Sequence, residues 1–224
     1  MQMLPCKQVS KADWLSPVGL MAISFIPIVA GALRLGRLAG GTAITPENAR
    51  FAVAPLSVAL HNIGSTLFSV LGAFQFSTGL RQRSPQWHRV SGRVVAASGV
   101  GTALSGVWMT LMYPIPAALQ GDLLFGVRLL VGTVVLMAII LAVTAAMHGD
   151  ITKHRAWMIR GYALGQGAGM QTLVPMPWML ILGTPSVLQR DVLMSLIWTI
   201  NICVSEMIIQ QRSFRTFRFY MAVP

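Results

Sequence analysis

Six apolar windows, each about 20 residues long, constrain the fold of this chain more than any other feature. A helix needs about 20 consecutive apolar residues to cross the hydrocarbon core of a bilayer. Hydrophobic residues make up 54% of the chain and charged residues only 10%, which leaves a soluble globule too little polar surface to cover itself. The sequence therefore predicts an all-α, six-transmembrane-helix bundle with short loops. The predicted helices span residues 17–35, 51–76, 90–112, 123–147, 156–173 and 192–210.

Prolines and capping residues refine these boundaries. Pro17 suits a first helical turn, whereas Pro27 and Pro55 should bend the first and second helices. Pro175, followed by a second proline two residues later, should end or break the fifth helix, and Asp122 stands where the N-cap of the fourth helix is expected. We divide the chain into a cytoplasmic N-terminal segment, a transmembrane domain and a basic-aromatic cytoplasmic tail, which cover residues 1–16, 17–210 and 211–224.

The positions of the basic residues predict the orientation in the membrane. The loops after the second and fourth predicted helices and the C-terminal tail all carry Arg or Lys, and such loops stay on the cytoplasmic side. Both termini should therefore be cytoplasmic, in a multi-pass protein of the bacterial inner membrane. The formal net charge of +11 is explained by this asymmetry and by attraction to anionic head groups. Nucleic-acid binding would need a basic soluble domain, which the sequence lacks.

Two His-Arg dipeptides are the candidate functional residues. His88-Arg89 and His154-Arg155 each stand at the start of an apolar run, and Arg93 and Arg160 follow just inside these runs. Ionisable side chains within a membrane are costly and commonly mark a binding site. We therefore expect the two histidines and their arginines to converge at the cytoplasmic mouth of the bundle. His61, in the second predicted helix, is a further candidate, although a hydrogen-bonded interior histidine, with Asn201 as a partner, is the plainer interpretation.

A weak internal repeat links the third and fifth predicted helices. The stretches 88–93 and 154–160 have similar orders of residue types, and each opens a glycine-rich helix. This pattern is compatible with two pseudo-repeated hairpins, formed by helices two to three and four to five, or with chance. The glycines allow helices, or a flat ligand, to approach closely.

The same residues resemble a known family. Trp87-His88-Arg89-Val-Ser-Gly-Arg93, the string from His154 to Leu164, His61 and the 201–206 pattern resemble a bacterial family of predicted integral membrane proteins, domain of unknown function 2306. The resemblance extends from the second to the sixth predicted helix and implies a membrane protein without specifying its biochemistry. The helix count and histidine placement also look faintly like the six-helix cytochromes b, as an analogy of architecture alone.

Haem b is one hypothesis for the site. His88 and His154 could be its axial metal ligands, with Arg89, Arg93, Arg155 or Arg160 binding the propionates. A second haem is disfavoured, because His61 and His148 should lie roughly 20 Å apart along the membrane normal. Any electron transfer would then need a quinone or a partner to complete the path.

Two other hypotheses use the same groups without a haem. Arginine beside histidine can bind the phosphate of a phospholipid or the polar head of a quinone, because a guanidinium grips oxyanions and an imidazole exchanges one proton. Alternatively, the chain is a non-catalytic accessory or scaffold subunit that binds lipid and other membrane subunits. In that case Glu206 forms a structural salt bridge with Arg155, Arg160 or a loop.

Overall fold

The computed structural model describes residues 11–41, 45 and 48–221, and within these ranges the side chains of residues 14–211. The regular elements in this part of the chain are all helices, which confirms the all-α prediction. Five of the described helices are long and apolar enough to cross a membrane. They are α1 (Lys11–Ala39), α3 (Pro55–Gln75), α5 (Pro85–Met112), α6 (Asp122–Met147) and α10 (Val187–Met221).

The fifth predicted helix is a chain of three short helices rather than one continuous helix. They are α7 (Ile151–Gly165), α8 (Gly167–Leu173) and α9 (Pro175–Leu182), and Gln166 and Val174 join them with right-handed helical dihedral angles. The second junction precedes Pro175, which lacks the N–H needed to continue the hydrogen-bond ladder. The sequence predicted this break at the proline but missed the one at Gln166.

Side chains of α10 satisfy backbone groups at the first junction. Asn201 Nδ2 donates to the carbonyl of Ala163 at 3.0 Å, and Trp198 Nε1 donates to that of Leu164 at 3.2 Å. A kinked helix needs such partners in a membrane, because lipid offers no hydrogen bonds to an unsatisfied carbonyl. The sequence suggested Asn201 as a partner for His61. Asn201 instead donates its hydrogen bond to the kink between α7 and α8.

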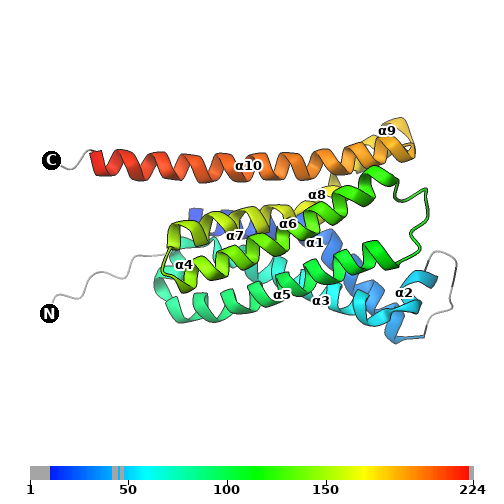
Figure 1. The fold of residues 1–224 in the computed structure, drawn as a ribbon, viewed down its shortest axis with the longest axis horizontal. Coiled ribbons are helices and arrows are strands. Elements are labelled where there is room, and N and C mark those ends of the chain that lie inside the picture. The colour runs from blue at the N-terminus through cyan, green and yellow to red at the C-terminus, as the bar shows by residue number, and fades with distance from the viewer. Residues whose placement is uncertain (1–10, 42–44, 46–47, 222–224) are drawn as a thin grey trace.

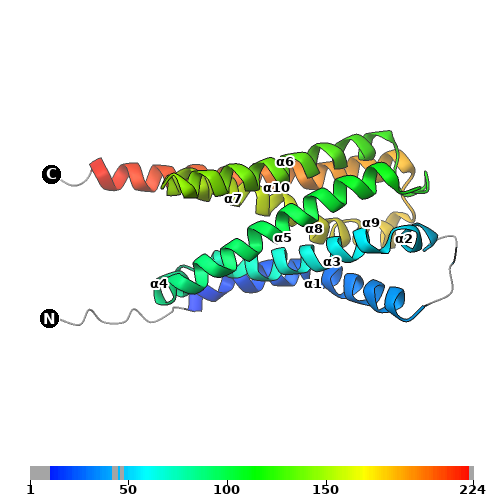
Figure 2. The ribbon, with the colours of Figure 1, turned by 60° about the horizontal axis from the view of Figure 1, so that its bottom comes forward.

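The helices form a ring in chain order, with α10 on its outside. Each of α1, α3, α5, α6 and α7 packs against the next, and α8 closes the ring by packing on α1. α10 lies along α6, α7 and α8 (Figures 1 and 2). Two short helices cover the ends of the ring: α2 (Ala49–Val53) and α4 (Thr78–Arg83). We name the two ends of the bundle the α4 end and the α9 end; α1 begins and α10 ends at the α4 end (Figure 1).

Glycines let large side chains fill the centre of the ring. A Cβ on Gly72 would lie 2.3 Å from the Tyr162 ring, and one on Gly99 or Gly165 would lie 2.6–2.7 Å from Phe68. Phe68 and Tyr162 are buried together, with ring centroids 5.4 Å apart. The glycine-rich faces of α5 and α7 therefore serve helix packing, the plainer of the two roles that their spacing indicated.

Three helix boundaries differ from those predicted. Pro55 is the first residue of α3 rather than a bend within a helix, and Pro17 lies inside α1 instead of in its first turn. α10 continues as one helix to Met221, past the predicted end at residue 210, and its last turns project beyond the other helices (Figure 1). Of the predicted N-terminal segment, residues 1–10 lie outside the described residues.

The N-cap of α6 is supplied by another helix. Gly121 is the cap residue and has no side chain to accept a hydrogen bond, whereas Asp122, the predicted cap, is the first helical residue. The carboxylate of Asp191 in α10 takes this role: it accepts the backbone N–H of Gly121 at 3.2 Å and that of Leu124 at 3.0 Å. A Cβ on residue 121 would lie 2.5 Å from Asp191 Oδ2, so this close approach requires glycine.

Candidate functional site

His88 lies in the first turn of α5, at the α4 end, with its ring half-buried. Its Nδ1 is buried and has no hydrogen-bond partner among the described residues. The charges of Arg81, in α4, and of His154, in α7, both act on this ring. The two histidines therefore lie at the same end of the bundle, as their matching positions in the sequence indicated. A buried polar atom without a hydrogen-bond partner needs an explanation. One explanation is that this nitrogen binds a ligand.

His154 is held in one orientation by the neighbouring helix α6. Its Nδ1 lies 2.9 Å from the carbonyl oxygen of Ala142. A carbonyl can only accept, so Nδ1 must carry the proton, and the neutral ring then presents Nε2 as an acceptor. A backbone carbonyl that fixes the tautomer in this way is also typical of histidines that bind ligands. His148, at the same end, bonds a carbonyl of its own helix, with Nδ1 2.8 Å from Thr144 O, and is exposed.

Asp150 begins the helix that carries His154. Its side chain caps α7 by accepting the backbone N–H of Lys153 at 2.9 Å, and it also pairs with the ammonium of that lysine at 3.3 Å. The pKa of Asp150 is lowered, chiefly by the hydrogen bond from the Lys153 backbone N–H. The carboxylate therefore stays ionised at neutral pH and complements the positive end of the α7 dipole.

Arg89 and Arg93 point away from the histidines. Both are exposed, one helical turn apart, on the face of α5 that also carries the exposed Val90 and Val94. The buried face of α5 runs instead through residues such as Val95. These arginines therefore lie on the outer surface of the bundle near the α4 end, where long cationic side chains reach the head-group layer.

Arg160 is paired with Glu206, which confirms the structural salt bridge that the sequence suggested for this glutamate. The pair is bidentate: Arg160 Nε lies 2.5 Å from Oε1, and Nη2 lies 2.9 Å from Oε2. The guanidinium also stacks over Trp157, 4.7 Å from the ring centroid. Arg160 thus joins α7 to α10 and turns away from His154. Arg155 is half-buried, and no hydrogen bond or ion pair connects it to another described residue.

His61 is an interior histidine in the opposite half of the bundle. Its Nδ1 lies 3.1 Å from the carbonyl of Thr102 and 3.3 Å from the hydroxyl of Ser105, both in α5. Thr102 lies roughly 20 Å along α5 from His88, at 1.5 Å per residue. The hydrogen-bonded interpretation is confirmed, although the partner is Thr102. His61 is too far from the α4 end to share a ligand with His88.

A second polar arrangement crosses the centre of the ring. The Tyr162 hydroxyl donates to Ser69 O at 2.7 Å and accepts from Gln166 Nε2 at 2.7 Å, while Ser24 donates to Gln166 Oε1 at 2.8 Å. The three side chains that are linked in this way, Ser24, Gln166 and Tyr162, are all buried. It ties α1, α3 and α7 together at the kink and leaves none of its members unpaired. The sequence analysis did not select Tyr162 as a candidate. A polar tyrosine next to glycines in a membrane helix is the pattern that could have indicated it.

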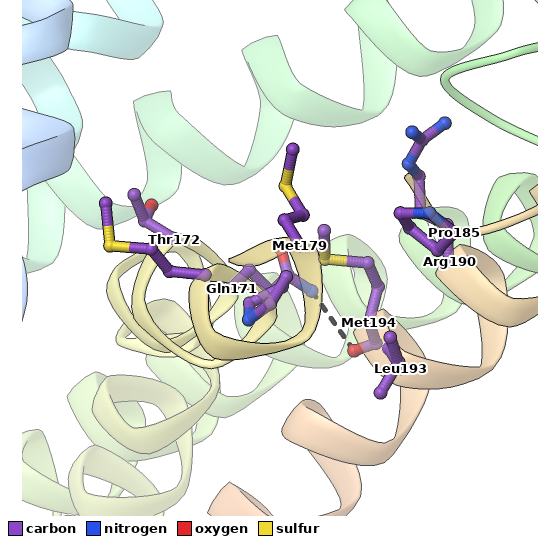
Figure 3. A pocket seen from close by; sticks show the side chains of 9 residues that line it. Gln171, Thr172, Met179, Pro185, Arg190, Leu193 and Met194 are labelled. Carbon is purple, nitrogen blue, oxygen red and sulfur yellow. Dashed lines mark hydrogen bonds between the residues drawn. The ribbon is translucent and has the colours of Figure 1, made fainter. Parts of the chain in front are cut away.

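A cavity of about 340 Å³ lies at the α9 end, between α8, α9 and α10. Met176, Met179 and Met194 line it together with Gln171 and Arg190 (Figure 3). Gln171 Nε2 donates to the carbonyl of Met194 at 3.2 Å, which fastens α8 to α10 beneath the cavity. Flexible thioether side chains adapt to irregular apolar shapes, so the methionines give this cavity an adaptable lining. The predicted site residues all lie outside it.

The described residues therefore form one small cluster rather than the larger predicted site. His88, His154 and Arg81 share the α4 end, whereas Arg89 and Arg93 face outward and the remaining predicted residues have other partners or positions. Within the described ranges, no group of three or more His, Cys, Asp or Glu side chains is placed to hold a metal ion.

A protein-family model matches most of the chain. The model of a family described as predicted membrane protein, DUF2306, matches residues 58–209, from α3 to α10. Neither a curated protein nor a solved structure matches the chain.

Proposed function

Because the chain belongs to the DUF2306 family of predicted membrane proteins, we propose that it is a membrane-embedded protein that binds the polar head of a quinone at the α4 end and assists electron transfer there. The observation that carries this proposal is the buried, unpartnered Nδ1 of His88, at the same end of the bundle as the oriented ring of His154. The pair stands where a head group dissolved in the bilayer would enter the bundle.

The two imidazoles supply what both redox forms of a quinone need. A quinone carbonyl accepts hydrogen bonds and a quinol hydroxyl also donates them, while each neutral imidazole carries one donor and one acceptor nitrogen. His154 offers Nε2 as an acceptor, because its Nδ1–H is taken by Ala142. His88 retains a free Nδ1, and Arg81 provides positive charge beside it. The pair can therefore hold either form and pass a proton to or from it.

The packing of the ring favours a quinone head group over a haem. A haem b held between α5 and α7 would need a flat slot along their glycines. Phe68 and Ile139 pack against Gly99, and Phe68 also packs against Gly165. The space beside these glycines is too small even for one added methyl group. The residues present do not fit a haem inside the ring, and a head group bound by the helix ends needs no such slot.

Binding of a short-chain benzoquinone to the purified protein tests this proposal. Quenching of tryptophan fluorescence would report binding, and His88→Ala should weaken it about tenfold or more, as expected when a buried hydrogen bond is lost. His148→Ala is the matched control, because it removes an exposed histidine at the same end and should leave the affinity unchanged. Equal affinity in the His88→Ala protein, or no binding to the wild type, would contradict the proposal.

The visible spectrum of the same sample separates the redox alternatives. A Soret band that shifts on addition of dithionite and is lost in His154→Ala would show that a haem is bound after all. A featureless spectrum together with quinone binding is the expected result. A protein that binds neither, yet co-purifies with other membrane proteins, would support the accessory-subunit alternative.

A further inference from the structure

Three arginines from three separate helices gather at the α9 end, opposite the histidine pair. They are Arg34 near the end of α1, Arg50 in α2 and Arg128 in the second turn of α6, and together we call them the arginine cluster. The guanidinium carbons of Arg34 and Arg50 lie 4.6 and 4.8 Å from the centroid of the same Phe51 ring. Two cationic groups from different helices thus contact the same aromatic ring.

The ring that holds them is itself fixed. Phe51 packs edge-on against Tyr113, with centroids 6.2 Å apart, and the Tyr113 hydroxyl donates to the carbonyl of Ala54 at 2.8 Å. Burial raises the pKa of Tyr113, so the phenol stays protonated and remains a donor at neutral pH. These contacts hold the short helix α2 against the end of α5. The packing of α2 therefore fixes where the backbone of Arg50 lies.

Arg50 is the centre of the cluster. Its charge acts on Arg34 and also on Arg128. Arg128 is half-buried, and its Nη1 donates to the side-chain oxygen of Gln120, which leaves its other guanidinium N–H groups available. Like charges repel, so three guanidinium groups at one end of the bundle favour the binding of a negative charge there.

The described part of the chain does not supply enough of it. Asp191 is the carboxylate whose charge acts on Arg128, but its two oxygens already accept the backbone N–H groups of Gly121 and Leu124. No ion pair joins a member of the arginine cluster to a described carboxylate, and Glu47, three residues before Arg50, lies outside the described residues. Nη1 of Arg50 is buried without a hydrogen-bond partner in the same residues. A buried donor on a charged group is costly to leave unpaired.

We propose that Arg34, Arg50 and Arg128 form a binding site for an oxyanion of the phosphate class. Guanidinium forks match the geometry of phosphate oxygens, and several of them around one oxyanion form the usual recognition pattern. The cluster lies where the transmembrane helices end, at the depth of the head groups of the leaflet on the α9 side. The phosphate of an anionic phospholipid and a free phosphate compound share this chemistry.

Thermal unfolding in a phosphate-free detergent solution tests the site. The melting temperature would be followed while one of three probes is added at constant ionic strength: inorganic phosphate, short-chain phosphatidylglycerol, or a short-chain diacylglycerol that lacks the phosphate. A ligand that binds the folded state raises the melting temperature with its concentration. A rise with phosphatidylglycerol alone supports a lipid head group, and a rise with both phosphorus compounds supports a free oxyanion. A rise with neither, or an equal rise with the diacylglycerol, overturns the proposal.

Charge-matched variants assign the effect to the cluster. Arg50→Gln should raise the apparent Kd for the stabilising probe about tenfold or more, the usual consequence of losing a hydrogen bond to a charged group. Arg83→Gln, which removes an exposed arginine at the α4 end, should leave the Kd unchanged. If Arg50→Gln does not fold, Arg34→Gln, at an exposed residue, takes its place. Equal weakening in Arg83→Gln, or an unchanged Kd in the cluster variant, would overturn the proposal.

Discussion

Replacing Asp191 by alanine should destabilise the bundle strongly, although the residue lies far from the histidine pair. Its carboxylate is 2% exposed and accepts two backbone N–H groups at the start of α6. The variant leaves both donors without an acceptor. The N–H of Leu124 is buried, so losing its hydrogen bond to the carboxylate should cost about 2–3 kcal/mol of folding free energy. The N–H of Gly121 is only partly buried and water can replace its partner, which should add about 1 kcal/mol or less.

The expected total of about 3 kcal/mol should lower the melting temperature by roughly 6–12 °C in a chain of this size. The fluorescence of the six tryptophans would follow the transition in detergent micelles. Hydrogen exchange of the peptide that begins at Gly121 would locate the effect, because the freed amides should exchange faster in the variant.

Asp122→Asn is the matched control for this prediction. It removes an exposed carboxylate from the first turn of the same helix, where only the interaction with the helix dipole is lost, at about 0.3–1 kcal/mol. A melting temperature for Asp191→Ala that falls no further than that of Asp122→Asn would refute the cross-helix cap, and so would unchanged exchange at Gly121 and Leu124.

Three further predictions follow from contacts described above. Gly72→Ala should destabilise the protein by about 1–3 kcal/mol, because the new Cβ would meet the Tyr162 ring at 2.3 Å, and thermal unfolding measures this. Glu206→Gln should cost only about 1 kcal/mol, since the ion pair with Arg160 is partly exposed, and a double-mutant cycle of the two residues isolates the term. The pKa of Asp150 is lower in the folded protein than its ordinary value of about 3.9. The stability that the ionised carboxylate contributes is therefore complete above this ordinary value and is lost as the pH falls through the folded pKa. The difference in melting temperature between wild type and Asp150→Asn should shrink below about pH 4.

Each of these predictions has an internal reference. Gly101→Ala should be tolerated, because no atom lies within 4 Å of the added Cβ. Alanine favours a helix more than glycine does, so an equal loss of stability in Gly101→Ala would show that the contact with Tyr162 is not the cause. A coupling energy near zero between Arg160 and Glu206 would count against their pairing. A pH-independent difference between wild type and Asp150→Asn would show that the pKa of Asp150 is not lowered in the folded protein.

The sequence predicted most of the fold because hydropathy alone decides which segments cross a bilayer. The five continuous spans, the break at Pro175 and a salt bridge of Glu206 all follow from local rules: length, a missing N–H, and the cost of an unpaired charge in lipid. Which cation pairs with Glu206 was left open between Arg155, Arg160 and a loop. The kink at Gln166 carries no such signal, because its carbonyls are satisfied by side chains of α10 that are distant in the chain.

The candidate site was harder to predict because the direction of a side chain depends on which helices surround it. His88 and His154 share an end of the bundle, as their positions in the sequence required. Arg89 and Arg93 follow one of these histidines closely, yet the rotation of α5 turns them outward. The arginine cluster was not predicted at all, since it depends on Phe51, which brings α1 and α2 together only in the folded chain.

The kinked span has a consequence for how the protein is assembled during synthesis. Residues 151–182 lack a continuous helix apolar enough to enter the bilayer unaided, and Arg160, six residues after His154, would oppose partitioning from the translocon by up to about 2.5–3.5 kcal/mol. Its counter-charge, Glu206, is translated later, within the last helix. The two segments should therefore partition as a pair, with the kinked segment retained beside the translocon until the ribosome has delivered the glutamate that neutralises it.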